Sequence, residues 1–316
     1  MRKHSAVAAA RLQRAATVDR LSALAADAWT ASCGPRGAVR DVAARIVAVD
    51  EAMASGRLLA MYVGAATPAE LRWRVDTLAA RWRDTPADDL LAALRPGGRR
   101  RLRVVRAVPG TAARLRTATP FGRQPLWYLL CRGTFDEWLG ERDVALATGS
   151  FDDAAVAPAI GDVLGWTVLA ASPAVTLPWV DRTVGVARVV VDAAGPVRQP
   201  DAADEAPPPV TGRDRGRGPV TGRDRGRGSV TGRDRGRGPV TRRTWGVDFA
   251  RRQYGPRVAA PPDATIRVTG PALALVAAGR VDRRRLPAES LLVEGDADLA
   301  AALLDAFARG AAAAGE

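Results

Sequence analysis

The spacing of apolar residues changes part-way along this chain of 316 residues, from the period of a helix to that of a strand. Between residues 71 and 82, four large apolar side chains fall at i, i+4, i+7 and i+11, which places them on one helical face. Between residues 264 and 269, apolar and polar residues alternate, as they do along a half-buried strand. Helices first and strands later, in a chain of this length, predict an α+β protein of two domains.

The first part of the chain is predicted to be an up-and-down bundle of helices over residues 13–178. Apolar stripes of helical period cover residues 18–29 and 39–53, and further helices are expected near 125–147 and 154–171. Thr67 precedes Pro68 and Glu70, a pattern typical of a capped helix start, and Thr85 begins a similar pattern. The apolar run at 154–180 is interrupted by Asp162 and two prolines, so a buried helix is expected rather than a membrane span.

The second part is predicted to be a small α+β domain made of residues 179–200 and 240–312. Strands are expected at residues 183–192, 244–249, 264–269 and 291–294, with helices at 271–278 and after Asp296, which can act as an N-cap.

Between the first two of these strands lies an insert of Arg-Gly repeats. The sequence Pro-Val-Thr-Gly-Arg-Asp-Arg-Gly-Arg-Gly occurs at 209–218 and 219–228, and again with one change at 229–238. Each copy holds one valine and no aromatic residue, so it cannot bury enough apolar surface to offset the entropy of ordering. Residues 201–239 are therefore predicted to be disordered and to lengthen a hairpin loop, a change that costs little free energy.

Charge and histidine content limit the functions open to the chain. The formal net charge is +13, and three repeats with three arginines and one aspartate each supply six of those charges. The single histidine, His4, falls in a segment predicted to be a flexible tail, residues 1–12. A histidine-built metal site or catalytic triad is therefore excluded. Cys33 and Cys131 are expected to be buried, unreactive thiols of a cytoplasmic protein.

Three segments carry a resemblance to a known family. They are residues 27–50, with Val-Arg-Asp-Val-Ala-Ala-Arg at 39–45; residues 132–144; and residues 266–296, with Thr-Gly-Pro at 269–271 and Glu-Gly-Asp at 294–296. In this order they resemble the mycothiol-dependent maleylpyruvate isomerase family of actinobacteria. The resemblance implies a DinB-like four-helix metal-binding domain followed by a sterol-carrier-protein-like α+β domain. A DinB-like bundle often pairs with a copy of itself, and the sequence leaves the oligomeric state open.

The resemblance also implies a divalent metal, zinc, and the thiol mycothiol. Family members are expected to hold the metal with a histidine at the position of Arg45, a carboxylate at Asp136 and a histidine at Gly140. Here only Asp136 matches, because a guanidinium has no free lone pair and glycine has no side chain. The resemblance therefore implies an isomerase or transferase whose metal site is lost, a pseudoenzyme. We hypothesise that an Arg45–Asp136 ion pair replaces the metal.

Other sites remain open at the level of sequence. Asp136, Glu141 and Asp143 could form an all-oxygen metal site, although their spacing shares a helical face only in part. The repeats resemble RNA-binding Arg-Gly segments, but each has an aspartate between its arginines and no aromatic residue for base stacking. A basic run at residues 99–106 is expected to be a solvated helix face. The candidate nucleic-acid contacts are Arg213, Arg215, Arg217, Arg223, Arg225 and Arg227.

Three functions therefore compete. The first is a non-catalytic protein that binds a small molecule or thiol, the second an active mycothiol-dependent enzyme with atypical metal ligands, and the third a nucleic-acid-associated protein. No membrane partner is expected.

Overall fold

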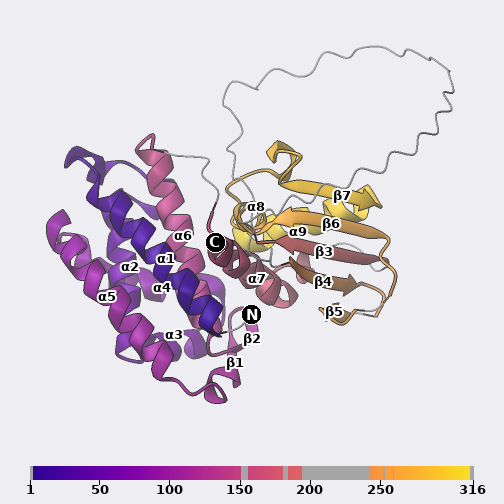
Figure 1. The fold of residues 1–316 in the computed structure, drawn as a ribbon, viewed down its shortest axis with the longest axis horizontal. Coiled ribbons are helices and arrows are strands. Elements are labelled where there is room, and N and C mark those ends of the chain that lie inside the picture. The colour runs from indigo at the N-terminus through magenta and orange to yellow at the C-terminus, as the bar shows by residue number, and fades with distance from the viewer. Residues whose placement is uncertain are drawn as a thin grey trace, which may run out of the picture.

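The computed structural model describes residues 3–150, 156–180, 184–193, 242–251, 253–258 and 260–313. Within these residues the chain is α+β, as predicted, with helices α1 to α6 gathered on one side of the molecule and a sheet on the other (Figure 1). The Arg-Gly insert at 201–239 lies outside the described residues, and so do the arginines proposed to contact nucleic acid.

The N-terminal helices follow the predicted stripes closely. Their bounds are α1 Lys3–Ser22, α2 Val39–Ala54, α3 Arg57–Gly64, α4 Pro68–Ala79, α5 Ala87–Ala107 and α6 Tyr128–Ala147, with a hairpin of β1 Arg116–Thr119 and β2 Gly122–Pro125 before α6. The Thr67 hydroxyl accepts a hydrogen bond from the Glu70 amide, which confirms the predicted cap of α4. The similar prediction for Thr85 is wrong, because Pro86 precedes α5 without a side-chain cap. Two aspartates in the first turn of α5 instead interact favourably with the positive end of the helix dipole.

The predicted flexible tail is wrong for residues 3–12, because α1 begins at Lys3 and contains His4. Ala6, Ala9 and Ala10 are almost completely buried in the core that also holds parts of α6 and α7. Alanine has the highest helix propensity, and a face of small side chains lets helices approach closely. The stripe expected over 18–29 also divides, since α1 ends at Ser22 and Trp29 lies in a separate turn of 3₁₀ helix at Asp27–Thr30.

The C-terminal part contains a five-stranded sheet with the strand order β5-β4-β3-β6-β7. Strands β3 and β6 run parallel at its centre, and the outer neighbours pair antiparallel. The antiparallel β3–β4 pair agrees with the predicted hairpin that carries the insert. Asp296 accepts a hydrogen bond from the Leu299 amide and caps α9, as predicted. The bounds are β3 Val186–Asp192, β4 Arg242–Asp248, β5 Gln253–Gly255, β6 Ala264–Thr269, β7 Leu291–Gly295, α8 Gly270–Ala277 and α9 Ala297–Ala313.

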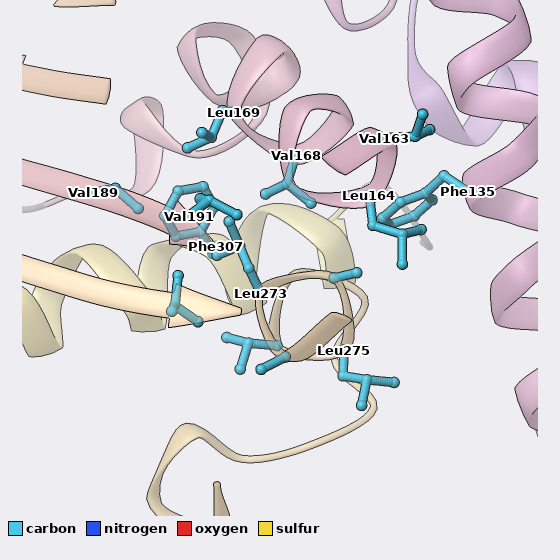
Figure 2. Close-up of a cluster of buried hydrophobic side chains, with 14 of the residues drawn as sticks. Phe135, Val163, Leu164, Val168, Leu169, Val189, Val191, Leu273, Leu275 and Phe307 are labelled. Carbon is cyan, nitrogen blue, oxygen red and sulfur yellow. The ribbon is translucent and has the colours of Figure 1, made fainter. Parts of the chain in front are cut away.

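Helix α7, Pro158–Val175, joins the two parts and packs against both. Figure 2 shows Phe135 of α6, Val168 of α7, Val191 of β3 and Leu273 of α8 in one apolar cluster. The predicted boundary at residue 178 therefore separates chain segments that share a core. Among the described helices, α7 alone is long and apolar enough to cross a membrane by length and composition, and 61% of that stretch is buried inside the protein.

The contact between α7 and α8 depends on glycine. A Cβ atom at Gly270 would collide with the Gly161 carbonyl, so the two backbones touch directly at this point. This close approach holds the start of α8, and with it the turn that follows α8, against the helical part of the molecule.

Candidate functional site

A cavity of about 510 Å³ lies between the helical part and the C-terminal helices. Its wall includes Arg45 of α2 and Asp136 of α6, two of the three positions that the sequence singled out. Residues of α3, α4, α5, α7, α8 and α9 also contribute to the lining. Much of the surface is apolar, with Tyr62, Phe121 and Phe135 among the larger side chains. Arginine is the most frequent polar residue in the wall.

The predicted Arg45–Asp136 ion pair is wrong. Arg45 pairs with Asp76 of α4, with 2.6 Å between Arg45 Nε and Asp76 Oδ1. Asp136 pairs with Arg132, one turn earlier on α6, at 2.9 Å between Arg132 Nη2 and Asp136 Oδ1. Each side chain therefore has a nearer partner: α4 packs across α2 and supplies Asp76, and the i, i+4 spacing on α6 supplies Arg132.

The space beside Gly140 is bordered by Val42 and by another arginine, Arg36, that the sequence did not single out as a site residue. A Cβ atom at Gly140 would lie 2.8 Å from Val42 Cγ1 and 3.5 Å from Arg36 Nη1. Arg36 Nη1 donates a hydrogen bond to the Asp136 carbonyl oxygen at 3.2 Å, and Arg36 Nε lies 2.9 Å from Asp143 Oδ2. A Cβ atom at position 140 would therefore clash with Val42 and lie in ordinary contact with Arg36.

The two substitute carboxylates have partners of their own. Asp143 binds Arg36 and also Arg280, which follows α8 and lies 2.9 Å away. Glu141 pairs instead with Arg20 of α1. The structure thus distributes Asp136, Glu141 and Asp143 among different arginines. Within the described residues no group of three or more histidine, cysteine or acidic side chains is placed to hold a metal ion.

These side chains do not fit the divalent metal that the family resemblance implies. Three protein ligands with free lone pairs are the usual minimum for such a site. Here position 45 carries a guanidinium, position 140 has no side chain, and the Asp136 carboxylate is held by Arg132. Guanidinium groups from Arg36, Arg45 and Arg132 around the same space would also repel a cation.

The cavity wall carries more positive than negative charge. Besides Arg101, the wall holds five arginines and two aspartates, Asp76 and Asp136. Asp143 lies outside the lining but pairs with Arg36 and Arg280, and counting it leaves a net charge of +2. The five arginines are Arg36, Arg45, Arg72, Arg132 and Arg280. Burial lowers the pKa of Arg36 and of Arg72, because the nearby aspartates do not fully offset the loss of solvation. An anion in the cavity would favour the charged form of both side chains.

Both cysteines are buried thiols, as predicted. Burial, together with the charge of Asp143, raises the pKa of Cys33 to about 11. Burial raises the pKa of Cys131 well above its ordinary value. Because the thiolate is the nucleophile, neither side chain is suited to nucleophilic chemistry at neutral pH.

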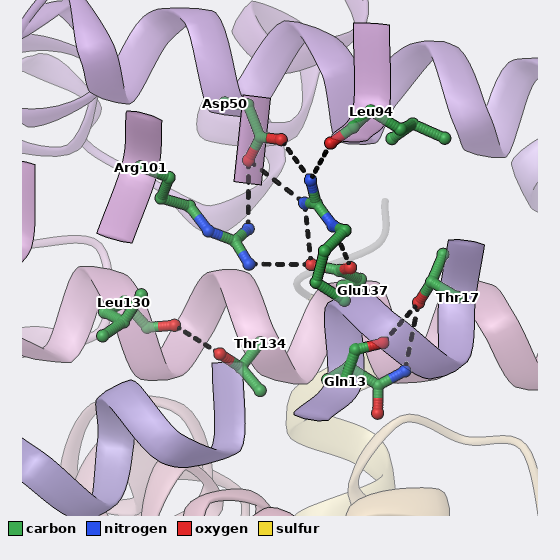
Figure 3. A network of polar contacts seen from close by, with 9 residues as sticks. Gln13, Thr17, Asp50, Leu94, Arg101, Leu130, Thr134 and Glu137 are labelled. Carbon is green, nitrogen blue, oxygen red and sulfur yellow. Dashed lines mark hydrogen bonds and ion pairs between the residues drawn. The ribbon is translucent and has the colours of Figure 1, made fainter. Parts of the chain in front are cut away.

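A buried cluster of four charges lies next to the cavity and was not foreseen from the sequence (Figure 3). Arg14 of α1 contacts Asp50 of α2 at 2.5 Å and Glu137 of α6 at 2.6 Å. Arg101 of α5 contacts the same two carboxylates, at 3.2 and 2.9 Å. Two positive and two negative charges balance, so the cluster is neutral. The prediction of a solvated basic face on α5 is therefore wrong for Arg101, which is 1% exposed.

Two adjacent glycines of α5 make room for this cluster. A Cβ atom at Gly97 would lie 2.7 Å from Asp50 Oδ2, and one at Gly98 would lie 2.8 Å from Arg14 Nη1. Pro96-Gly97-Gly98 within an otherwise helical pattern is the sequence signal that could have located it, because paired glycines inside a helix are unfavourable without a packing reason.

Known proteins offer few matches to this chain. No family model matches the chain, and no curated protein matches it. Two solved structures do, one at a TM-score of 0.47 and 12% identity over 93% of both chains. Both are mycothiol-dependent maleylpyruvate isomerases. The second, a single-site variant, matches at a TM-score of 0.43 and 12% identity over 92% of this chain and 96% of its own. This is the family that the sequence motifs resemble.

Proposed function

We propose that this chain binds a small anionic molecule in the cavity and does so without a metal ion, as a non-catalytic protein with the chain path of the maleylpyruvate isomerases. The observation that carries this proposal is the excess of arginine over aspartate in a wall that is otherwise largely apolar. Enclosed guanidinium groups bind carboxylates and other oxyanions strongly, through directed and charge-assisted hydrogen bonds.

The side chains at the three metal-site positions support a loss of metal chemistry. Arg45 and Asp136 each hold an oppositely charged neighbour, and Val42 and Arg36 border Gly140. An active mycothiol-dependent enzyme with atypical ligands is the alternative. It predicts one tightly held zinc per chain, whereas we expect dialysis to leave the purified protein with far less than one equivalent of zinc.

The proposed function is tested by calorimetric titration with small carboxylates and with mycothiol, the thiol named for the two solved structures. We expect Arg72→Gln to weaken carboxylate binding about tenfold or more, since it removes one charged hydrogen-bond donor from the cavity wall. Arg99→Gln is the matched control, because Arg99 lies on α5 with an exposed side chain outside the cavity lining. Equal affinities for the two variants, or binding of neutral molecules only, would overturn the proposal.

The nucleic-acid alternative stays a prediction from the sequence. It requires steeply salt-dependent RNA binding that disappears when residues 209–238 are deleted.

A further inference from the structure

Among the described residues, two arginines of the cavity wall, Arg101 and Arg280, each have a buried Nε–H without a hydrogen-bond acceptor, and Arg101 is the more deeply enclosed of the two. Arg101 lines the cavity and is 1% exposed, and its two terminal nitrogens contact Asp50 and Glu137. The N–H of its third nitrogen, Nε, has no hydrogen-bond acceptor among the described residues. A buried donor without an acceptor costs about 1–3 kcal/mol, so an oxygen atom placed beside it would be bound favourably.

Gly133 of α6 leaves space in front of this arginine. Gly133 also lines the cavity, and a Cβ atom there would lie 3.7 Å from Arg101 Nη1, in ordinary contact. Any larger side chain at position 133 would extend toward the Arg101 guanidinium or into the cavity. The absence of a side chain therefore contributes to the access that a ligand has to Arg101.

The charge balance around Arg101 indicates what kind of group belongs there. Arg14 and Arg101 are already matched by Asp50 and Glu137, all four of them buried. A third anion beside Arg101 would lie near these two carboxylates and lose more by repulsion and desolvation than it gains. A neutral oxygen, from a carbonyl or a hydroxyl group, accepts the hydrogen bond without adding charge.

We infer that the cavity contains an inner subsite, formed by Arg101 and Gly133, for a neutral oxygen acceptor of the ligand. The inference rests on the proposed function and deepens it. The ligand class is an organic acid whose acidic group faces the five arginines outside the buried cluster and whose apolar body carries a carbonyl or hydroxyl group at its other end.

Calorimetry with paired acids tests the subsite. The probes are straight-chain alkanoates of five to eight carbons and the oxo acids that carry one ketone at each position from C4 outward. We expect at least one oxo acid to bind the wild-type protein about tenfold or more tightly than its parent alkanoate, the gain of one hydrogen bond to a charged donor. If every oxo acid binds within twofold of its parent, the inference is overturned, while binding of the parents still supports the proposed function.

Two kinds of variant locate the effect. Arg101→Lys keeps the positive charge of the buried cluster but removes the Nε–H, and Gly133→Val narrows the space between α6 and the Arg101 guanidinium. Both should reduce the advantage of the oxo acid over its parent alkanoate to below twofold, whatever each does to the affinity for the parent. If Arg101→Lys does not fold, the test uses Gly133→Val and the smaller change Gly133→Ala. An oxo acid that keeps its advantage over the parent acid in both variants would overturn the inference.

Discussion

At the scale of single residues, the missing side chain at position 140 determines what occupies the space between α2 and α6. Val42 and Arg36 both border the place where a Cβ atom would project. Arg36, in turn, is held there by the Asp136 carbonyl oxygen and by Asp143. Gly140 and Arg36 together therefore shape this part of the site. The replacement of a metal ligand by Arg45 is not sufficient to explain it.

Adding a methyl group at position 140 should destabilise the protein, because the new Cβ would lie 2.8 Å from Val42 Cγ1. We expect Gly140→Ala to lower the free energy of unfolding by about 1–3 kcal/mol, despite the higher helix propensity of alanine. Urea denaturation measures this. The control is Gly133→Ala on the same helix, where the nearest atom is 3.7 Å away and stability should stay equal or rise slightly. A Gly140→Ala protein as stable as the control would contradict the steric account.

At the scale of elements, the neutral cluster of Arg14, Asp50, Arg101 and Glu137 joins four helices that are distant in sequence. One charge comes from each of α1, α2, α5 and α6. Apolar packing sets how closely these helices approach, and the four charges add directional contacts that favour one relative position of the helices. Gly97 and Gly98 are part of the same arrangement, because they leave room for two of its members.

Removing one carboxylate from the cluster should cost much more than removing a surface charge. Glu137→Gln leaves Arg14 and Arg101 with a single buried counter-ion, and we expect a loss of about 3–5 kcal/mol in the free energy of unfolding. Glu289→Gln, an exposed change of the same chemistry, should alter it by less than about 0.5 kcal/mol. Similar losses for the two variants would show that the cluster contributes little to stability.

The same carboxylate makes stability depend on acid. Burial alone would raise the pKa of Glu137, but the charges of Arg14 and Arg101 and their hydrogen bonds hold it at about 2, below its ordinary 4.5. A carboxylate with a lowered folded-state pKa stabilises the protein above pH 4.5, and this contribution disappears as the pH falls toward 2. Thermal melts between pH 6 and 2 should show a shallower acid decline for Glu137→Gln than for the wild type, and parallel curves would refute this assignment.

At the scale of the whole molecule, α7 makes the two predicted domains dependent on each other. Its residues pack against α1 and α6 on one side and against β3, α8 and α9 on the other, within one continuous core. A fragment that ends at residue 178 would expose the faces of Leu164 and Val168 that the C-terminal part covers.

We therefore expect residues 1–178, expressed alone, to lack the cooperative thermal transition of the full chain. Differential scanning calorimetry compares the two directly. A full-length chain that lacks only residues 219–228, one repeat of the insert, is the control and should melt like the wild type, because shortening a long connection changes closure entropy by well under 1 kcal/mol. A fragment that melts sharply near the temperature of the whole protein would show that the parts fold independently.

Local patterns predicted the elements of this fold better than they predicted its site. The helical stripe at 39–53, the Thr67 cap and the strand at 264–269 depend on nearby residues, and the structure confirms all three. The partner of Arg45 depends on which helix packs across α2, and the burial of Arg101 on where α5 meets α1 and α6. Such long-range pairings leave no periodic signal, and every arginine has the same local appearance whether it is solvated or enclosed.

The glycines of α7 have a consequence for how this protein can change over generations. Gly161 abuts the Ala193 carbonyl and the α8 backbone, and Gly165 abuts Val191 of β3. A larger side chain at either position would have to fit against residues of both the helical and the C-terminal parts. A side chain at an exposed position on α4 or α5 contacts few other residues. Natural drift should therefore be slowest along α7, and a library of random substitutions should lose folded members there first.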